Sequence, residues 1–331
     1  MTRSSHIPPA PLPQRSGIDP VRMRLPPDPE GRWPLLGDYL TERYAGTRGA
    51  ESMARLLDTG RVLGPGGRVL RAEDPYEPGG WLWYHRDMPD EPRVPFPIRV
   101  VHRDGHLLVV DKPHFLATTP RGSHVTETAL ARLRRELDLP ALSPAHRLDR
   151  MTAGLVMFSI RPEDRGAYQL LFQERRVHKR YEALAPHDPS VDLPRTVRSH
   201  IEKVRGVMAA TELPGVEPNA ESLVELVETR GPLGRYRLTP HTGRTHQLRV
   251  HMNSLGLPIL GDPVYPVVAA PTDPADFRRP LQLLARSLAF TDPVTGVDHR
   301  LETGLTLRAW EDPTGWETGP EPEGAQAPLA P

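Results

Sequence analysis

The sequence predicts an α+β fold from two kinds of segment that are mixed along the chain. Two pairs of apolar runs meet at turn residues and are typical of β-hairpins, one around Asp104-Gly105 and one around Gly231-Pro232-Leu233-Gly234. Segments 126–137, 163–176 and 245–254 have the character of helices, with apolar residues at helical spacing. Hairpins mixed with two or three packed helices indicate an α+β architecture rather than a doubly wound parallel sheet.

Three further runs complete the expected sheet. Residues 155–158 are apolar and β-favouring, and the run ends before Pro162, which predicts a short buried strand. Residues 177–184 form a second predicted strand, which carries Tyr181. A third strand is expected at 197–204, within an irregular stretch that is rich in proline.

The first 90 residues divide into two predicted segments. Residues 1–30 carry eight prolines and few large apolar groups, so we expect a disordered tail. Residues 31–90 are expected to form a small unit. Apolar residues recur at helical spacing within 36–40 and within 53–57, and a last strand is expected at 81–84.

Composition narrows the functional classes. The chain has 331 residues, 37% of them hydrophobic, and a formal net charge of +0, so no global basic field indicates a polyanionic partner. The charge is unevenly distributed. Residues 230–252 contain five arginines and no acid, which predicts a basic face, with a solvated sheet edge as the alternative. Residues 311–331 contain five acids and no Lys or Arg, which predicts an acidic flexible tail.

Cysteine is absent, which excludes disulfides and thiolate metal sites. No signal-peptide core and no run of about 18 apolar residues is found. We therefore expect a soluble cytoplasmic protein.

The segment that carries the chemistry is His146-Arg147-Leu148-Asp149-Arg150, which precedes the predicted strand at 155–158. Asp149 would lie on a loop at the mouth of that strand. A neighbouring guanidinium favours the ionised carboxylate, which fits a nucleophile or a base. The spacing of charges alone favours the alternative, a surface loop with solvated ion pairs.

A longer pattern resembles the RluA-type RNA pseudouridine synthases. Residues 146–158, HRLDRMTAGLVMF, are similar to the catalytic motif of that family, with Ala153 where a serine is usual. Residues 177–181, VHKRY, and residues 243–262, from GRTHQLRVHM to GD, resemble two further family segments in the same order. Three ordered motifs make the resemblance specific, and it implies a catalytic domain over residues 91–310.

The resemblance implies a mixed, largely antiparallel curved sheet with an RNA cleft across it. It implies that Asp149 is the essential aspartate, that Tyr181 stacks on the uracil, and that Arg249 pairs with the aspartate, with Arg244 as the weaker alternative. Arg147 resembles the residue that fills the space left by a flipped base. The further residues expected to contact RNA are His146, Arg150, Lys179, Arg244 and His246.

The expected partner is RNA, either rRNA or tRNA, and no cofactor, metal, membrane or protein partner is implied, so we expect a monomer. Residues 31–90 loosely resemble a small RNA-binding module named after a ribosomal small-subunit protein, although a packing appendage fits equally well. Glycoside hydrolysis would need two carboxylates, and no metalloprotease or phosphate-loop motif occurs. The alternative function is a catalytically silent RNA-binding protein of the same fold.

Overall fold

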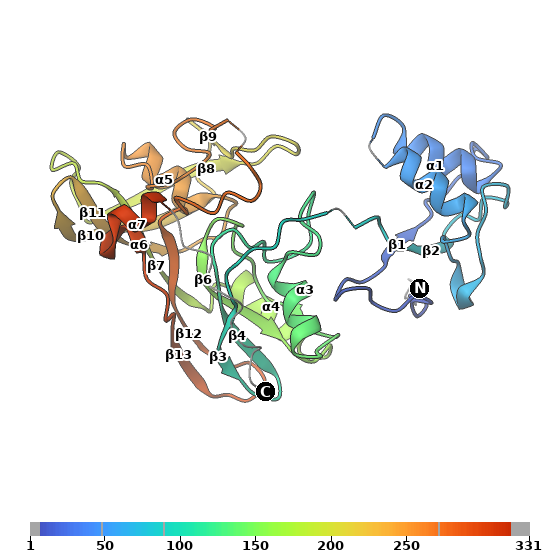
Figure 1. Ribbon diagram of the computed structural model, residues 1–331, viewed down its shortest axis with the longest axis horizontal. Coiled ribbons are helices and arrows are strands. Elements are labelled where there is room, and N and C mark those ends of the chain that lie inside the picture. Colours follow the sequence, from blue (N-terminus) through green and yellow to red (C-terminus); the bar gives the residue numbers. More distant parts are fainter. Residues whose placement is uncertain (1–6, 48, 89, 271, 319–331) are drawn as a thin grey trace. The chain divides into compact units, whose positions relative to one another are not determined.

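The computed structural model describes residues 7–47, 49–88, 90–270 and 272–318. The chain divides into two compact units, Met1–Asp90 and Glu91–Pro331, each with its own elements (Figure 1).

The first unit contains two helices and a two-stranded sheet. Its elements are β1 (Val21–Arg24), α1 (Leu36–Tyr44), α2 (Ala50–Asp58), the short 3-10 helix η1 (Pro65–Gly67) and β2 (Trp81–Tyr84). The inward faces of α1 and α2 meet in a common core, as their helical periodicity predicted.

The expectation of a disordered tail at residues 1–30 is wrong for the residues that the structure describes. Strand β1 pairs antiparallel with β2, and the side chains of Met23 and Leu25 are buried in the core of the unit. The prolines of this segment lie outside β1, whose alternation of apolar and basic residues buries one face and exposes the other.

The second unit is built on one sheet of eleven strands. Its strands are β3 (Arg99–Arg103), β4 (Leu107–Lys112), β5 (Ser143–Pro144), β6 (Ala153–Ser159), β7 (His178–Pro186), β8 (Arg195–Glu202), β9 (Thr211–Leu213), β10 (Ala220–Arg230), β11 (Leu233–Pro240), β12 (Leu283–Thr291) and β13 (Asp298–Glu302). The order is β3-β4-β6-β12-β7-β11-β10-β8-β9, with β13 beside β12 and β5 beside β6. All of these strand pairings are antiparallel except that of β6 with β12.

Within the described part of this unit, five helices accompany the sheet: α3 (Ala129–Glu136), α4 (Arg165–Gln173), α5 (Gln247–Ser254), α6 (Arg308–Glu311) and α7 (Pro313–Thr318). Helix α5 packs Leu248 and Met252 against residues of β7, β10 and β11. Gly256 follows α5 with a positive φ of 75°, as expected for a glycine just beyond a helix end. The predicted α+β class is confirmed. None of the helices in the described part of the chain has the length and apolar character that a bilayer crossing requires.

Gly154 lies where β6 meets its parallel neighbour. Its φ is 108°, and a Cβ at this position would lie 2.4 Å from the carbonyl oxygen of Ala285 on β12. Both the backbone conformation and the space therefore require glycine here. The loop that carries Asp149 runs directly into this contact.

The predicted acidic tail at 311–331 is wrong for its first part. Helix α7 follows α6 closely, and Trp316 is buried in a cluster with Trp310. The indole Nε1 of Trp316 donates a hydrogen bond of 3.0 Å to the carbonyl of Pro280. Burial of a large aromatic side chain fixes this segment to the domain. Residues 319–331 lie outside the described residues.

Candidate active site

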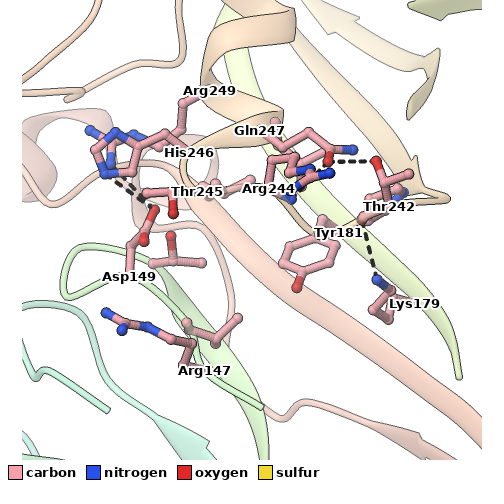
Figure 2. Close-up of a pocket in the computed structure, with 16 residues that line it drawn as sticks. Arg147, Asp149, Lys179, Tyr181, Thr242, Arg244, Thr245, His246, Gln247 and Arg249 are labelled. Atoms are coloured by element: carbon pink, nitrogen blue, oxygen red, sulfur yellow. Dashed lines mark hydrogen bonds and ion pairs between the residues drawn. The ribbon is translucent and has the colours of Figure 1, made fainter. Parts of the chain in front are cut away.

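A cavity of about 200 Å³ lies at the mouth of β6, between β7 and the segment that joins β11 to α5 (Figure 2). It is lined by residues that the sequence separates widely. Asp149 and Arg249, which are 100 positions apart, lie with side-chain atoms 3.4 Å from each other. Tyr181 from β7 lines the same cavity, so the fold brings the three predicted catalytic residues together.

The loop that carries Asp149 is held by hydrogen bonds to its backbone. The hydroxyl of Thr118 donates to the carbonyl of Leu148 and accepts from its N–H. The amide of Thr152 donates to the carbonyl of Asp149 at 3.1 Å. The Asp149 side chain itself is 26% exposed, so the carboxylate faces the cavity from a fixed backbone.

Lys112 supports the same loop from below the surface. Its ammonium group is fully buried and donates to the carbonyls of Pro113, Leu116 and Arg150, the last at 3.5 Å. Burial, opposed by the negative charge of Asp149, lowers the pKa of Lys112 to about 7.

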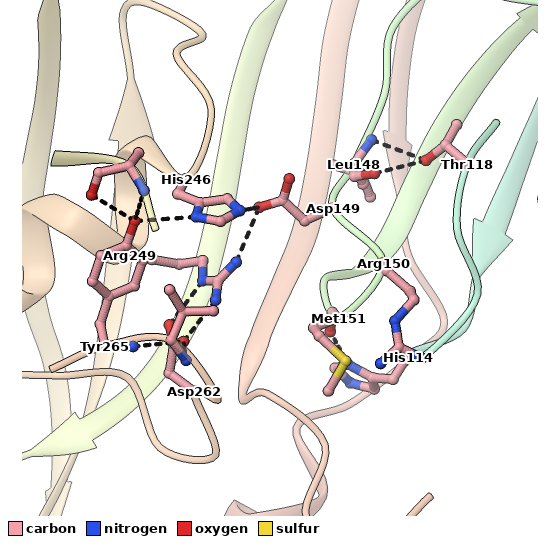
Figure 3. Close-up of polar contacts among 12 residues, drawn as sticks. His114, Thr118, Leu148, Asp149, Arg150, Met151, His246, Arg249, Asp262 and Tyr265 are labelled. Carbon is pink, nitrogen blue, oxygen red and sulfur yellow. Dashed lines mark hydrogen bonds and ion pairs between the residues drawn. The ribbon is translucent and has the colours of Figure 1, made fainter. Parts of the chain in front are cut away.

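The main partner of Arg249 is Asp262, which our sequence analysis did not assign to the site. Two nitrogens of Arg249, Nε and Nη2, donate to the two carboxylate oxygens of Asp262 at 2.8 and 2.6 Å, and both side chains are buried (Figure 3). The third nitrogen, Nη1, is left to face Asp149. Burial alone would lower the pKa of Arg249, but the hydrogen bonds and charge of Asp262, and then the charge of Asp149, raise it. Arg249 is therefore a permanent cation beside Asp149.

His246 lies beside Arg249 and approaches the same carboxylate oxygen of Asp149. Its Nε2 lies 3.8 Å from the carboxylate, and its Nδ1 is 3.1 Å from the hydroxyl of Tyr265. Burial lowers the pKa of His246, although Asp149 opposes the shift. The residue has a left-handed backbone with φ of 60° at the start of α5, a strained conformation for a residue with a Cβ.

Tyr181 forms a partly buried wall of the cavity and packs against the hydrophobic core below it. Burial raises the pKa of its phenol, and the charge of Asp149 raises it further. Tyr181 is therefore neutral at physiological pH and offers a flat ring with one hydroxyl.

Gln247 shapes the segment that joins β11 to α5. Its side-chain oxygen accepts from the hydroxyl of Thr242 and from the N–H of Arg244, while its NH2 donates to Glu221 and Ser222 of β10. This buried amide fixes the backbone from which Arg244 and His246 extend. No role was predicted for Gln247, although it belongs to the third motif, residues 243–262.

Of the six residues predicted to contact RNA, four line the cavity, one lies beside it and one does not line it. Arg147, Lys179, Arg244 and His246 line the cavity, and the side chain of Arg147 is free of hydrogen bonds and ion pairs within the described residues. His146 lies just beside it, with its ring stacked on Phe172 and its Nε2 accepting from the N–H of Met157.

Arg150 is the exception, because it does not line the cavity. Its guanidinium reaches the carbonyl of Phe115 at 3.4 Å, in the region of His114 and Met151 (Figure 3). Asp149 and Arg150 are neighbours on a loop, and their side chains point to different sides of it. The spacing of charges in the sequence does not predict these directions.

The arginine-rich segment 230–252 does not form one basic face. Arg230 lies over the ring of Trp310, and Arg235 and Arg237 pair with Glu228 and Glu225 across the β10–β11 hairpin. Only Arg244 and Arg249 of the five line the cavity. The acids that balance this segment lie on the partner strand, just before it in the sequence.

One group of possible metal ligands occurs among the described residues. His102, Asp104 and His299 have ligand atoms within 4.8 Å of one another, and His102 is hydrogen-bonded to Asp104 at 3.0 Å. None of the three lines the cavity, so the group is separate from Asp149.

Comparisons with known proteins identify relatives of this chain. A sequence model described as RNA pseudouridylate synthase matches residues 106–254, which include Asp149, Tyr181 and Arg249. The dual-specificity RNA pseudouridine synthase RluA of Pasteurella multocida is 34% identical over 210 residues, which span 59% of this chain and 88% of that protein. The ribosomal large subunit pseudouridine synthase D of Pseudomonas aeruginosa is 33% identical over 224 residues, which span 63% of this chain and 68% of that protein.

A solved structure supports the fold. Human RNA pseudouridylate synthase domain containing 1 superimposes with a TM-score of 0.52 at 24% identity, covering 67% of this chain and 89% of that one. The chain therefore belongs to the RluA-type family of RNA pseudouridine synthases, isomerases that convert uridine in RNA to pseudouridine.

Proposed function

We propose that this protein isomerises specific uridines in structured rRNA or tRNA, with Asp149 as the residue that starts the chemistry. The observation that carries the proposal is the position of the Asp149 carboxylate in one cavity, 3.4 Å from a guanidinium and beside an aromatic ring. The name of one relative refers to the large ribosomal subunit, which supports rRNA as a substrate, and the name of another describes a dual specificity, which supports more than one RNA substrate.

The proposed reaction keeps all atoms of the uridine. The bond between ribose C1′ and N1 of uracil breaks, the base turns within the cavity, and C5 bonds to C1′. The C5 hydrogen leaves as a proton and N1 takes up a proton, so the composition of the nucleotide is unchanged. Asp149 acts at the ribose, either by attacking the sugar or by removing a ribose proton. The role of Arg249 is to keep this carboxylate ionised and in place, as its fixed attachment to Asp262 suggests.

Tyr181 is proposed to hold the detached base. Its ring is flat and partly buried, which suits stacking on uracil. Its phenol keeps its proton, so the hydroxyl is available for proton transfer. Confinement against a rigid strand would keep the base near C1′ while the new bond forms.

The uridine must leave the RNA stack to reach a cavity at the mouth of a strand. Arg147 is proposed to fill the space that the base leaves, because it is exposed at the rim of the cavity. Lys179, Arg244 and His246 are proposed to contact the RNA around the extruded nucleotide. Arg150 is left out of this proposal, since it hydrogen-bonds elsewhere.

All groups used in this proposal come from one chain, so we propose that a monomer in the cytoplasm, without a cofactor, is sufficient. The test is release of tritium from rRNA and tRNA transcripts labelled at C5 of uridine, with Asp149→Asn as the control. Release by the wild type alone would support the proposal. RNA binding without release by the wild type would instead indicate a catalytically silent RNA-binding protein.

A further inference from the structure

A second cavity, of about 440 Å³, adjoins the catalytic one and shares part of its wall. Arg147, Lys179, Tyr181 and Arg244 line both cavities. The second cavity is also lined by Phe172 near the end of α4 and by Arg175 just beyond that end. A ligand that filled both cavities would contact the protein along its length, from Asp149 to Arg175.

The lining of this cavity has an excess of positive charge. Arg147, Arg175, Lys179 and Arg244 contribute to it, and no Asp or Glu is among its lining residues. Burial, and then the nearby charge of Arg175, lowers the pKa of Lys179. The Arg175 side chain makes no hydrogen bond or ion pair with the described residues, although Glu221 lies within range of its charge. Four cations around a polar cavity without a carboxylate in its lining favour an anionic ligand.

The backbone at Arg175 gives an independent indication. Its φ is 59°, and its N–H and that of Arg176 bond back to the carbonyls of Phe172 and Leu171 at the end of α4. This is the left-handed position that follows a helix, where glycine is usual because a Cβ is strained. An exposed arginine at such a position indicates that its side chain is used for something other than the fold.

We propose that the second cavity binds the phosphodiester of a nucleotide adjacent to the reacting uridine, with Arg175 as its outer contact. The inference rests on the proposed function, because it assumes that a uridine enters the catalytic cavity and that the adjoining RNA backbone lies next to that cavity. Lys179 and Arg244 contact the same stretch of backbone from the shared wall. Arg175 is thus a positioning residue, which holds the flanking backbone so that the uridine enters beside Asp149.

The chain offers a matched control for the test. Arg176 is adjacent, exposed and paired with Glu174, and it does not line the cavity. Binding of the rRNA or tRNA transcript that the wild type converts is measured between about 50 and 200 mM salt for Arg175→Ala, Arg175→Gly and Arg176→Ala.

Both Arg175 variants should bind about tenfold more weakly at the lower salt concentration. They should also lose about one unit of salt slope. Arg175→Gly should melt at the same temperature as the wild type or higher, because it relieves the backbone, so weak binding cannot be attributed to misfolding. Arg176→Ala should bind as the wild type does. Equal binding by the Arg175 and Arg176 variants would overturn the proposal.

A second experiment locates the phosphate. A synthetic RNA that the wild type converts is prepared with a neutral methylphosphonate linkage on one side or the other of the target uridine. One of the two linkages should abolish the difference between wild type and Arg175→Ala, and full additivity at both linkages would overturn the inference. If the wild type binds RNA but converts none of the transcripts, the proposed function fails. The comparison of Arg175 with Arg176, made on the transcript that the wild type binds most tightly, still decides whether the second cavity binds phosphate.

Discussion

Arg249 and Asp262 form a buried two-point ion pair, and the one guanidinium nitrogen outside that pair faces Asp149. The carboxylate of Asp262 also accepts the backbone N–H groups of Val264 and Tyr265, which fixes its position. Arg249 therefore has little freedom to follow a ligand. Its orientation is set by the protein before RNA binds.

Asp262→Asn should lower both the stability and the activity of the enzyme. Loss of one partner leaves a buried guanidinium without its compensating charge, an effect of about 3–5 kcal/mol in the free energy of unfolding. Scanning calorimetry and tritium release measure the two effects. Asp276→Asn is the control, because its partner Arg278 is exposed and such pairs contribute about 1 kcal/mol or less. Equal destabilisation by the two variants would contradict the buried pair.

The double variant Arg249→Met with Asp262→Asn should be more stable than Asp262→Asn alone, yet inactive. It removes both charges, and the asparagine oxygen still accepts from Val264 and Tyr265. Asp149 nevertheless loses its neighbouring cation. Single-turnover rates at saturating RNA check the outcome. A double variant with wild-type rates would exclude Arg249 from the chemistry and leave Arg244 as the candidate partner of Asp149.

Asp149→Asn should abolish pseudouridine formation while RNA affinity stays within a few fold. The exchange is isosteric, and Arg249 keeps its two hydrogen bonds to Asp262, so the melting temperature should change little. Tritium release and filter binding report the two quantities. Detectable product from this variant would show that another group starts the reaction.

Lys112→Met should remove a pH dependence from the stability of the protein. Burial lowers the pKa of Lys112 to about 7, while an unfolded lysine has a pKa of about 10.4. Between these values the unfolded state binds more protons, so this group adds stability as pH rises. The penalty of burying its charge is fully present below about pH 7.

The wild type should therefore gain up to about 1.4 kcal/mol per pH unit relative to Lys112→Met between about pH 7 and 10. Urea unfolding of both proteins at several pH values measures the difference. Parallel curves for the two proteins would show that burial does not lower the pKa of Lys112.

Removal of residues 1–30 should unfold the first unit, because it deletes β1 and the buried side chains of Met23 and Leu25. Met23→Ala, a milder change, should destabilise that unit by about 2–5 kcal/mol. Hydrogen exchange of α1 and α2 reports the loss. Unchanged protection in the truncated protein would show that β1 contributes nothing to the fold.

Local pattern predicted most of the elements that build the site. The apolar run before Pro162 became β6, and the segments around Leu248 and Leu171 became α5 and α4. The spacing of apolar residues is sufficient to predict such elements, because the apolar side chains that it places on one face are those that the core buries. The Asp104-Gly105 turn likewise joins β3 to β4 as predicted.

Pairings across the tertiary structure were not predictable in the same way. Nothing in the spacing of Arg249 and Asp262 shows that a guanidinium will meet that carboxylate at two points. The charges of Arg235 and Arg237 gave a misleading sign of a basic face, because their partners come from the opposite strand of a hairpin. The strand β1 was missed since the proline content of its surroundings outweighed four alternating residues.

The close approach of Gly154 to Ala285 has a consequence for how this enzyme can vary. The backbone contact fixes the start of β6, and only four residues separate it from Asp149. One inserted residue there would shift the carboxylate by up to about 3.8 Å, more than its 3.4 Å distance from Arg249 could accommodate. Insertions and deletions that preserve the enzyme should therefore be confined to other connections, such as the one between β7 and β8, whose residues line neither cavity. The length of the catalytic loop is a constraint on the evolution and the redesign of the enzyme.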